Sequence, residues 1–209
     1  MELANLTLKE FLGKTAGNEP VPGGGSISAL NGAIAAALAE MVANLTIGRK
    51  KYADVDELMQ TLAPRFQALQ AQMTHDIDRD SEAYDRVFNA FKLPKETDEE
   101  KAARREAIQR ETKYAAQVPM EVARAVAALM PDIATVGRKG NQNAVTDACV
   151  AMMCARNAVV GALLNVRINL TSLADADFVG EMTAEADRLE QEALSQEAEL
   201  LAYVKQQLA

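Results

Sequence analysis

The sequence contains no tryptophan, and aromatic residues make up only 4% of its 209 residues, although hydrophobic residues make up 49%. Any core must therefore be built mainly from Ala, Leu, Val, Ile and the 9 Met. The sequence also has no run of β-branched residues alternating with polar ones, as a half-buried strand would require. Small apolar side chains without such runs favour closely spaced helices over a β-sandwich.

Positive charge is also in short supply. The chain has 22 Lys and Arg against 30 Asp and Glu, which gives a formal net charge of −8. Because neutralising phosphates requires a surplus of Lys and Arg on some face, this balance argues against nucleic acid as the main partner. Small basic spots remain at residues 49–51 and 138–139, and solvated helix ends are the simpler interpretation of both.

Cysteine and histidine are scarce, which limits covalent and metal chemistry. Cys149 and Cys154 are five residues apart in an apparently helical stretch, so their side chains point to different faces and we expect no disulfide between them. His75 is the single histidine, and the chain lacks the Glu-x-x-His pairs of di-iron bundles. We therefore expect no metal site.

The sequence lacks the usual signs of export or membrane insertion. Its start carries acidic and polar residues where a signal peptide has a basic start and an apolar run. The most apolar segment, residues 27–47, includes Asn31, Glu40 and Asn44 among small side chains, so we interpret it as a buried helix. We expect a cytoplasmic protein with no membrane partner.

Apolar residues recur at three- and four-residue spacing along most of the chain. This pattern predicts an all-α bundle of about six or seven helices, in a single domain covering residues 1–209. Pro64 must either open a new helix or kink the one predicted over residues 54–91, and we expect a single long helix with a bend. In the next helix, which starts at Thr97, we expect Pro119 to be an interruption and Pro131 to be the end. Residues 132–145 are then predicted to be a loop that carries function. The expected helices cover about 7–17, 26–47, 54–91, 97–130, 143–171 and 176–208.

Three consecutive glycines, Gly23, Gly24 and Gly25, stand with Ser26 at the start of the second predicted helix. Glycine tolerates positive φ and lets a ligand approach the main chain, so this stretch can offer free amides to an anion or a polar ring. The simpler alternative is a tight turn with Ser26 as helix cap and no ligand. It is not a Walker loop, because no Gly-Lys-Ser/Thr follows.

A second group of candidates surrounds Asp147. This carboxyl group follows Thr146 within an otherwise apolar helical stretch, where it would lie against the core unless it faces a cleft. A carboxyl group in such a place can have a raised pKa and serve as acid or base. Asn141 and Asn143 stand just before it, and Asn143 or Thr146 could instead be only a helix cap.

Two further polar pairs recur one helical turn apart. Asp76 and Asp80 are predicted to share a helix face, with Tyr84 one turn further on. Asn165 and Asn169 share a face in the middle of an apolar helix, where amides need partners from a ligand or a subunit contact. The sequence does not decide between those two sources.

Four separated segments, taken in order, resemble the cyclodeaminase/cyclohydrolase family. That family includes the C-terminal domain of formiminotransferase-cyclodeaminase and free-standing methenyltetrahydrofolate cyclohydrolases, and the resemblance covers nearly the whole chain. It implies an all-helical fold, a homodimer with the active site near the subunit interface, and a tetrahydrofolate derivative as substrate, with no permanently bound cofactor. The segments are PVPGGGSISALNGAIAAALAEMVANLT, DRDSEAY with FKLPK, VGRKGNQNAVTDACVA and ALLNVRINL.

The resemblance also suggests roles for the candidate residues. Asp147 is the first candidate for acid or base chemistry, and Thr146 stands where the family commonly has Ser. Asp80 and Lys95 are secondary candidates, and Arg138 is a candidate for attracting the glutamate tail of folate. Residues expected to position water or to bind the substrate are Gly23, Gly24, Gly25, Ser26, Asn141 and Asn143.

The family resemblance leaves two reactions open. The protein is expected to be a methenyltetrahydrofolate cyclohydrolase, which hydrolyses the one-carbon bridge, or a formiminotetrahydrofolate cyclodeaminase, which closes that bridge and releases ammonia. The same acid or base would serve both reactions. Alternatives from other classes are a helical dimer that acts only as a scaffold and a regulator that binds anions at the glycine stretch.

Overall fold

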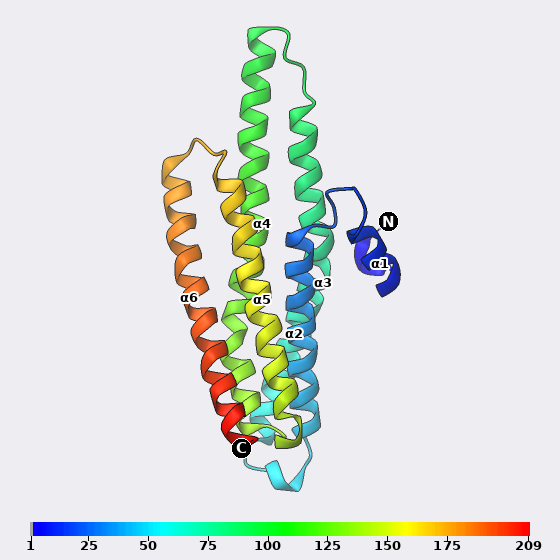
Figure 1. The fold of residues 1–209 in the computed structure, drawn as a ribbon, viewed down its shortest axis with the longest axis vertical. Helices are drawn as coiled ribbons and strands as arrows, with labels where there is room; N and C mark the ends of the chain where they lie inside the picture. Colours follow the sequence, from blue (N-terminus) through cyan, green and yellow to red (C-terminus); the bar gives the residue numbers. More distant parts are fainter. Residues whose placement is uncertain (1) are drawn as a thin grey trace.

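The computed structural model describes residues 2–209 and confirms the all-α bundle. Six α-helices follow one another along the chain, and no strand occurs among these residues (Figure 1). Three short 3-10 turns, at Leu3–Asn5, Lys50–Tyr52 and Gln142–Ala144, lie between or before the helices. The helices are α1 (Leu8–Thr15), α2 (Gly24–Thr46), α3 (Asp56–Phe91), α4 (Asp98–Lys139), α5 (Val145–Leu170) and α6 (Ala176–Gln207).

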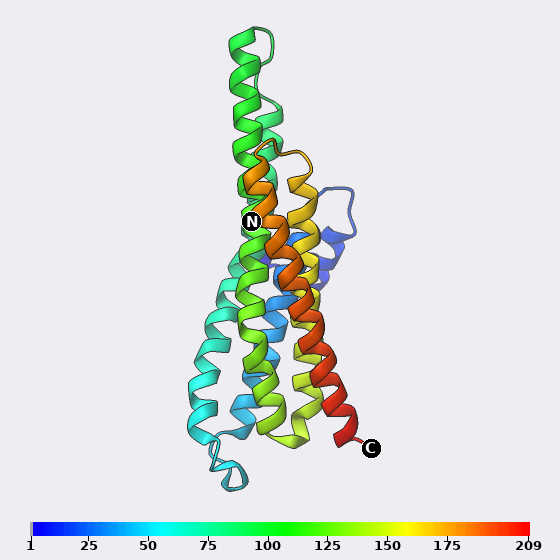
Figure 2. The same cartoon turned by 90° about the vertical axis from the view of Figure 1, so that its left-hand side faces the viewer.

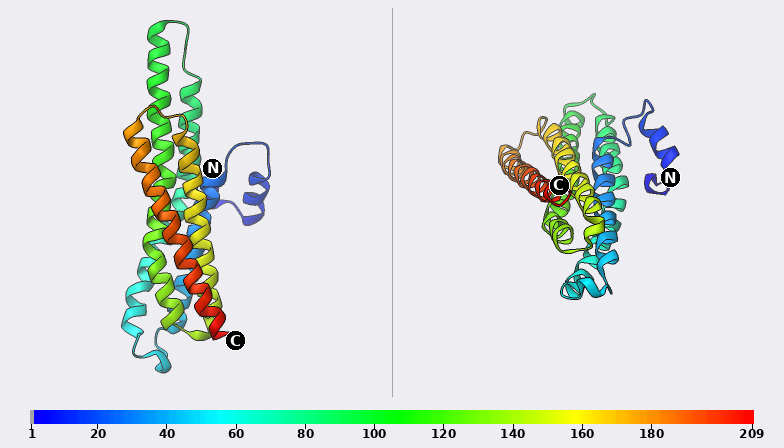
Figure 3. Two further views of the ribbon diagram at one scale, coloured as in Figure 1. Left: turned by 60° about the vertical axis from the view of Figure 1, so that its left-hand side comes forward. Right: turned by 60° about the horizontal axis from the view of Figure 1, so that its bottom comes forward.

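Helices α2 to α6 run side by side along the long axis of the molecule, whereas α1 stands out from the side of the bundle (Figures 1 and 3). Helix α2 packs mainly against α3 and α5, and α4 packs against α3, α5 and α6. The N-terminal turn is held to α3 by Asp78, whose carboxylate accepts hydrogen bonds from the main-chain N–H groups of Leu3 and Ala4. The N-terminal segment is therefore anchored to α3.

Small residues bring the helix backbones close together, as the alanine-rich pattern predicted. A Cβ added to Gly32 of α2 would lie 2.9 Å from Val126 of α4 and 3.0 Å from Met73 of α3. A Cβ added to Gly161 of α5 would lie 2.5 Å from the Ser28 hydroxyl of α2. These separations leave no room for a larger residue at either glycine, so side chains of the neighbouring helices pack directly against the glycine main chain.

The long helix predicted over residues 54–91 is confirmed, but Pro119 and Pro131 do not divide or end the next helix, which corrects the sequence prediction there. Helix α3 runs through Pro64, and α4 runs through both Pro119 and Pro131 to Lys139. Most of the loop predicted over residues 132–145 is therefore helix. A proline removes one main-chain N–H, but residues on both sides of Pro131, including Met130 and Ile133, are fully buried and hold the helix in the core.

One face of the bundle, formed by α2 and α5, is covered by no other element of the described chain (Figures 1 and 3). By length and composition alone, α2 and residues 142–170 would each be long and apolar enough to cross a membrane. About half of each segment is buried within the bundle, 56% and 50% respectively. The uncovered part, called here the α2/α5 face, exposes Ile34, Met41, Leu45, Val150, Leu164 and Ile168.

Helices α3 and α4 project beyond their neighbours at one end of the bundle (Figures 1 and 2). The first turn of α2 packs beside Asp80 of α3, and α3 then continues for eleven more residues to Phe91. At 1.5 Å per residue this is about 16 Å of helix that α2 does not cover. Because α2 begins well short of the projecting end of α3, a recess is left at the amino end of α2.

Candidate functional site

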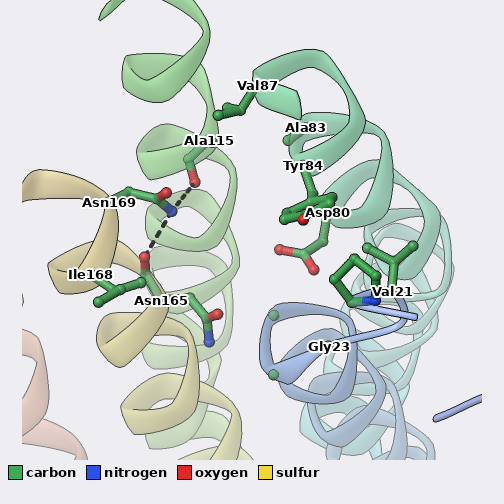
Figure 4. A pocket seen from close by; sticks show the side chains of 13 residues that line it. Val21, Gly23, Asp80, Ala83, Tyr84, Val87, Ala115, Asn165, Ile168 and Asn169 are labelled. Atoms are coloured by element: carbon green, nitrogen blue, oxygen red, sulfur yellow. Dashed lines mark hydrogen bonds between the residues drawn. The ribbon is translucent and has the colours of Figure 1, made fainter. Parts of the chain in front are cut away.

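The recess at the amino end of α2 holds a pocket of about 320 Å³. This volume is near the lower end of the range for small-molecule sites in proteins. The pocket is bounded by the loop before α2, the first turn of α2 and three other helices, α3, α4 and α5 (Figure 4). Its lining residues are Pro20, Val21, Gly23, Gly24, Gly25, Asp80, Ala83, Tyr84, Val87, Ala115, Asn165, Ile168 and Asn169.

The glycine stretch forms the floor of this pocket, but for a different reason from the one predicted. Gly23 is the N-cap residue of α2 in an extended conformation, and Gly24 and Gly25 belong to the first helical turn. Among residues 2–209 only Gly48 has positive φ. A Cβ on Gly25 would lie 1.9 Å from Oδ1 of Asp80. The missing side chain, and not backbone freedom, is therefore what Gly25 contributes.

Asp80 reaches from α3 to the first turn of α2. Its Oδ2 lies 3.1 Å from the hydroxyl of Ser26, which also lies 2.9 Å from the carbonyl oxygen of Ile77. Burial raises the pKa of Asp80 above its ordinary value, and hydrogen bonds from the Ser26 hydroxyl and N–H partly oppose that rise. A pocket carboxyl group with a raised pKa is suited to exchanging protons with a bound molecule.

Two amides face Asp80 from the opposite wall of the pocket, on α5 (Figure 4). Asn165 donates from Nδ2 to the carbonyl oxygen of Gly161 at 2.9 Å. Asn169 donates from Nδ2 to the carbonyl oxygens of Ala115 at 3.0 Å and Asn165 at 2.9 Å. The amide oxygens of Asn165 and Asn169 have no protein donor among the described residues, so they are free to accept hydrogen bonds from water or a ligand.

The remaining walls are apolar or aromatic. Tyr84 lines the pocket and stacks on Phe88 one turn further along α3, with ring centroids 6.2 Å apart. Val87 and Ile168 complete the sides. The Tyr84 ring gives a flat ligand a surface on which to stack.

The group around Asp147 lies at the other end of the bundle. Asp147 and Asn165 are on the same helix, 18 residues apart, which corresponds to about 27 Å along the axis. Thr146 is exposed and Asp147 is partly buried, and neither lines the pocket. Within one chain, the structure therefore does not bring Asp147 together with Asp80.

Asn141 and Asn143 connect elements at that distant end. The main-chain N–H of Asn141 donates to the Thr46 hydroxyl at 2.8 Å, and its side-chain amide donates to the carbonyl oxygen of Leu45 at 3.2 Å. Its Oδ1 accepts from the N–H of Asn143 at 3.1 Å. These contacts tie the end of α2 to the start of α5, so Asn141 has a structural role and caps a 3-10 turn.

The two predicted cationic residues also lie outside the pocket. Arg138 is exposed near the end of α4, 5.7 Å from the centre of the Tyr203 ring and 4.0 Å from Glu199. Lys95 is exposed in the connection between α3 and α4, at the projecting end of the bundle. Neither lines the pocket in the isolated chain.

Asp76, one turn before Asp80 on α3, is the other acidic residue of the predicted pair. Asp76 is only 1% exposed and lies against Arg79, which pairs in turn with Glu121 of α4, so it does not share the pocket. No cluster of three or more His, Cys, Asp or Glu suited to a metal ion occurs in residues 2–209. Asp80 is therefore the acidic residue among those that line the pocket.

Sequence reasoning missed the contribution of α4. Ala115 lines the pocket and accepts a hydrogen bond from Asn169. The only available signal was Pro119, which stands four residues later and so leaves the carbonyl of Ala115 without its helical N–H partner. That signal identifies a free carbonyl group but does not reveal which residue donates a hydrogen bond to it.

The fold and the pocket define a helical-bundle protein with a pocket of small-molecule size at the amino end of α2. The chain belongs to the formiminotransferase-cyclodeaminase family, whose sequence pattern matches residues 7–188. This confirms the resemblance drawn from the four sequence segments.

Individual relatives cover almost all of the chain. It is 41% identical to a methenyltetrahydrofolate cyclohydrolase of Methylorubrum extorquens, over 90% of this chain and 91% of that protein. It is 36% identical to the formimidoyltransferase-cyclodeaminase of Rattus norvegicus, over 95% of this chain but only 37% of that longer protein. The crystal structure of formiminotetrahydrofolate cyclodeaminase from Thermotoga maritima superposes with a TM-score of 0.88 at 29% identity, covering 100% of both chains.

Proposed function

We propose that this protein is an enzyme of folate one-carbon metabolism, and specifically a methenyltetrahydrofolate cyclohydrolase. The observation that carries the proposal is the 41% identity to the Methylorubrum extorquens cyclohydrolase over nearly the full length of both chains. The pocket at the amino end of α2 supports it, because an aromatic wall, a carboxyl group of raised pKa and amide acceptors suit a flat polar ring.

The proposed reaction begins at a carbon that is already electrophilic. In methenyltetrahydrofolate this carbon joins two nitrogens as a cationic amidinium. Water adds to the carbon and gives up a proton, which Asp80 accepts in this proposal because it is the carboxyl group that lines the pocket. The hydroxyl proton of the adduct then passes to one nitrogen as that carbon–nitrogen bond breaks, which leaves a formyl group on the other nitrogen.

The substrate's own charge would prepare Asp80 for this role. Burial favours the neutral acid in the empty pocket. A cationic amidinium beside Asp80 lowers its pKa again, so substrate binding favours the carboxylate that serves as base. Loss of the positive charge as water adds removes this effect and raises the pKa of Asp80 again, which helps the group to hold the proton that it takes from water; the next cationic substrate expels that proton to solvent.

Formiminotetrahydrofolate cyclodeaminase is the second candidate, supported by the Thermotoga maritima structure and the rat relative. In that reaction the aniline nitrogen attacks the formimino carbon, and ammonia leaves after taking a proton. Asp80 would supply that proton from its neutral form. The pocket described above suits both reactions.

Parallel assays of the purified protein on the two substrates distinguish these candidates. Loss of the methenyl chromophore above the rate in buffer establishes the cyclohydrolase. Appearance of the chromophore together with released ammonia establishes the cyclodeaminase. A folded protein inactive on both substrates would contradict the proposal and favour a scaffold.

We also propose that the protein acts as a homodimer joined through the α2/α5 face. The exposed apolar residues of the α2/α5 face support contact with the same face of a second copy of this chain, because an apolar surface is costly to leave in water. Helices α2 and α5 are antiparallel (Figure 1), so a two-fold axis across their midpoints would turn the start of one α5 toward the pocket of the other subunit.

That arrangement would reconcile the two groups of candidate residues. Asp147 of the partner subunit would approach the pocket that holds Asp80, and the two carboxyl groups would divide the proton transfers between them. Light scattering that gives a monomeric mass at assay concentrations would contradict the dimer without contradicting the activity.

A further inference from the structure

The side-chain amides of Asn165 and Asn169 each have a fixed orientation. Their Nδ2 atoms lie 2.9 to 3.0 Å from main-chain carbonyl oxygens, of Gly161 for Asn165 and of Ala115 and Asn165 for Asn169. Turning either amide over would place its oxygen against these carbonyl oxygens, where it would find no hydrogen. Each residue therefore offers a ligand its Oδ1 acceptor.

The orientation of Asn169 depends on a proline in another helix. In an unbroken α-helix the carbonyl of Ala115 would accept from the N–H of residue 119. Residue 119 is a buried proline within α4 and has no N–H. Asn169 supplies the missing donor at 3.0 Å. Because a buried carbonyl group without a partner is costly, this hydrogen bond holds the amide in place.

The position of Asn165 is set by the floor of the pocket. A Cβ on Gly24 would lie 3.1 Å from Nδ2 and 3.6 Å from Oδ1 of Asn165, so the amide rests directly on the first turn of α2. The two asparagines, one turn apart on α5, therefore form a wall of acceptors. A ligand that fills the pocket must present N–H groups to that wall or leave the acceptors unpaired.

We propose that Oδ1 of Asn165 and of Asn169 accept hydrogen bonds from N–H groups of the substrate ring, in particular from the 2-amino group of a pterin, and that Pro119 is the positioning residue for Asn169. The assignment rests on the proposed function, because that function identifies the ring. It adds a specificity element that does not take part in the proton transfers.

The test compares two substrates in each variant. One is methenyltetrahydrofolate, and the other is its analogue with a methyl group in place of the 2-amino group. An acceptor left unpaired in the pocket costs enough to lower kcat/KM for the analogue by about 10-fold or more in the wild type. In Asn169→Leu and Asn165→Leu the ratio of kcat/KM for the two substrates falls toward one, and the change appears in KM more than in kcat.

Proline substitutions separate recognition from folding. Asn169→Leu leaves the Ala115 carbonyl without a donor and lowers the melting temperature. The double variant Asn169→Leu/Pro119→Ala restores an N–H at residue 119, so it regains stability while the preference stays lost. Pro119→Ala alone makes the Asn169 amide compete for the Ala115 carbonyl and leaves it held only by the carbonyl of Asn165, which reduces the preference. The control Pro131→Ala, in the same helix but away from the pocket, retains it.

The outcomes are distinguishable. Turnover of both substrates with an undiminished preference in both asparagine variants would overturn the inference and leave the proposed function intact. A wild-type protein that shows no preference would overturn it as well. A wild-type protein that turns over neither substrate would overturn the proposed function and this inference with it.

Discussion

Replacing Gly25 with alanine tests the closest contact in the proposed active site. The added Cβ would lie 1.9 Å from Oδ1, 2.4 Å from Cγ and 2.6 Å from Oδ2 of Asp80. Ordinary contact begins near 3.4 Å, so the carboxyl group must move by about 1.5 Å. Misplacing a reacting group by about 1 Å can cost a factor of about 10² in rate. We expect Gly25→Ala to lower kcat/KM by about 10²-fold or more.

Although Gly25→Ala should lower activity, the higher helix propensity of alanine should by itself increase stability. Gly25 lies in the first turn of α2 without positive φ, so alanine would itself favour the helix by up to about 1 kcal/mol. The displaced Asp80 loses its contact with Ser26 and offsets that gain. Gly180→Ala in α6 is the matched control, because its Cβ meets nothing within 4 Å. It should gain stability and keep full activity.

A double-mutant cycle isolates the clash. In an Asp80→Ala background the obstructing carboxyl group is absent, so adding Gly25→Ala should leave the residual activity unchanged and raise the melting temperature. Steady-state kinetics and thermal unfolding of the four proteins provide the cycle. If Gly25→Ala costs the same activity with and without Asp80, the contact between them does not explain its effect.

Four other predictions concern the two carboxyl groups and the dimer. Asp80→Asn should lower kcat by about 10²-fold or more with the fold intact, and normal turnover would remove Asp80 from the mechanism. Because burial raises the pKa of Asp80 in the folded state, its stabilising effect is complete below the unfolded pKa and is lost as pH rises through the folded pKa. The melting temperature of Asp80→Asn should therefore gain on the wild type over that pH window, and a constant difference would contradict the raised pKa. Asp147→Asn should lower kcat by about 10²-fold if the partner's carboxyl group completes the site, and unchanged turnover would exclude it. Met41→Glu on the α2/α5 face should shift light-scattering mass toward the monomer, and an unaltered dimer would place the interface elsewhere.

Much of the fold was predictable because helix signals are local. Apolar spacing located the main helices, and Thr97 with Glu100 forms the capping box expected at the start of α4. The error at Pro131 has a nonlocal cause. The burial of Met130 and Ile133 in the packed bundle outweighs the hydrogen bond that the proline removes.

The site was predictable only in parts. The glycine stretch and Asp80 were both candidates, but their contact joins residues more than fifty positions apart and depends on how α2 packs against α3. Asp147 was ranked above Asp80 from its apolar sequence neighbours, and these neighbours do not report on the distance to the pocket. The pairing of Asn169 with the carbonyl left free by Pro119 links two helices, and no local pattern contains it.

The close approach of the helix backbones limits how the substrate range of this fold can change. At Gly25, Gly32 and Gly161 an added Cβ would lie within 3.0 Å of side chains on a neighbouring helix, so a larger residue would have to displace those side chains. Few substitutions are therefore tolerated at the glycines that form the pocket floor. Side chains that project from the walls, such as Tyr84 and Ile168, are free of that restriction. Selection for a new ligand, in nature or in the laboratory, would act first on those walls and leave the helix frame unchanged.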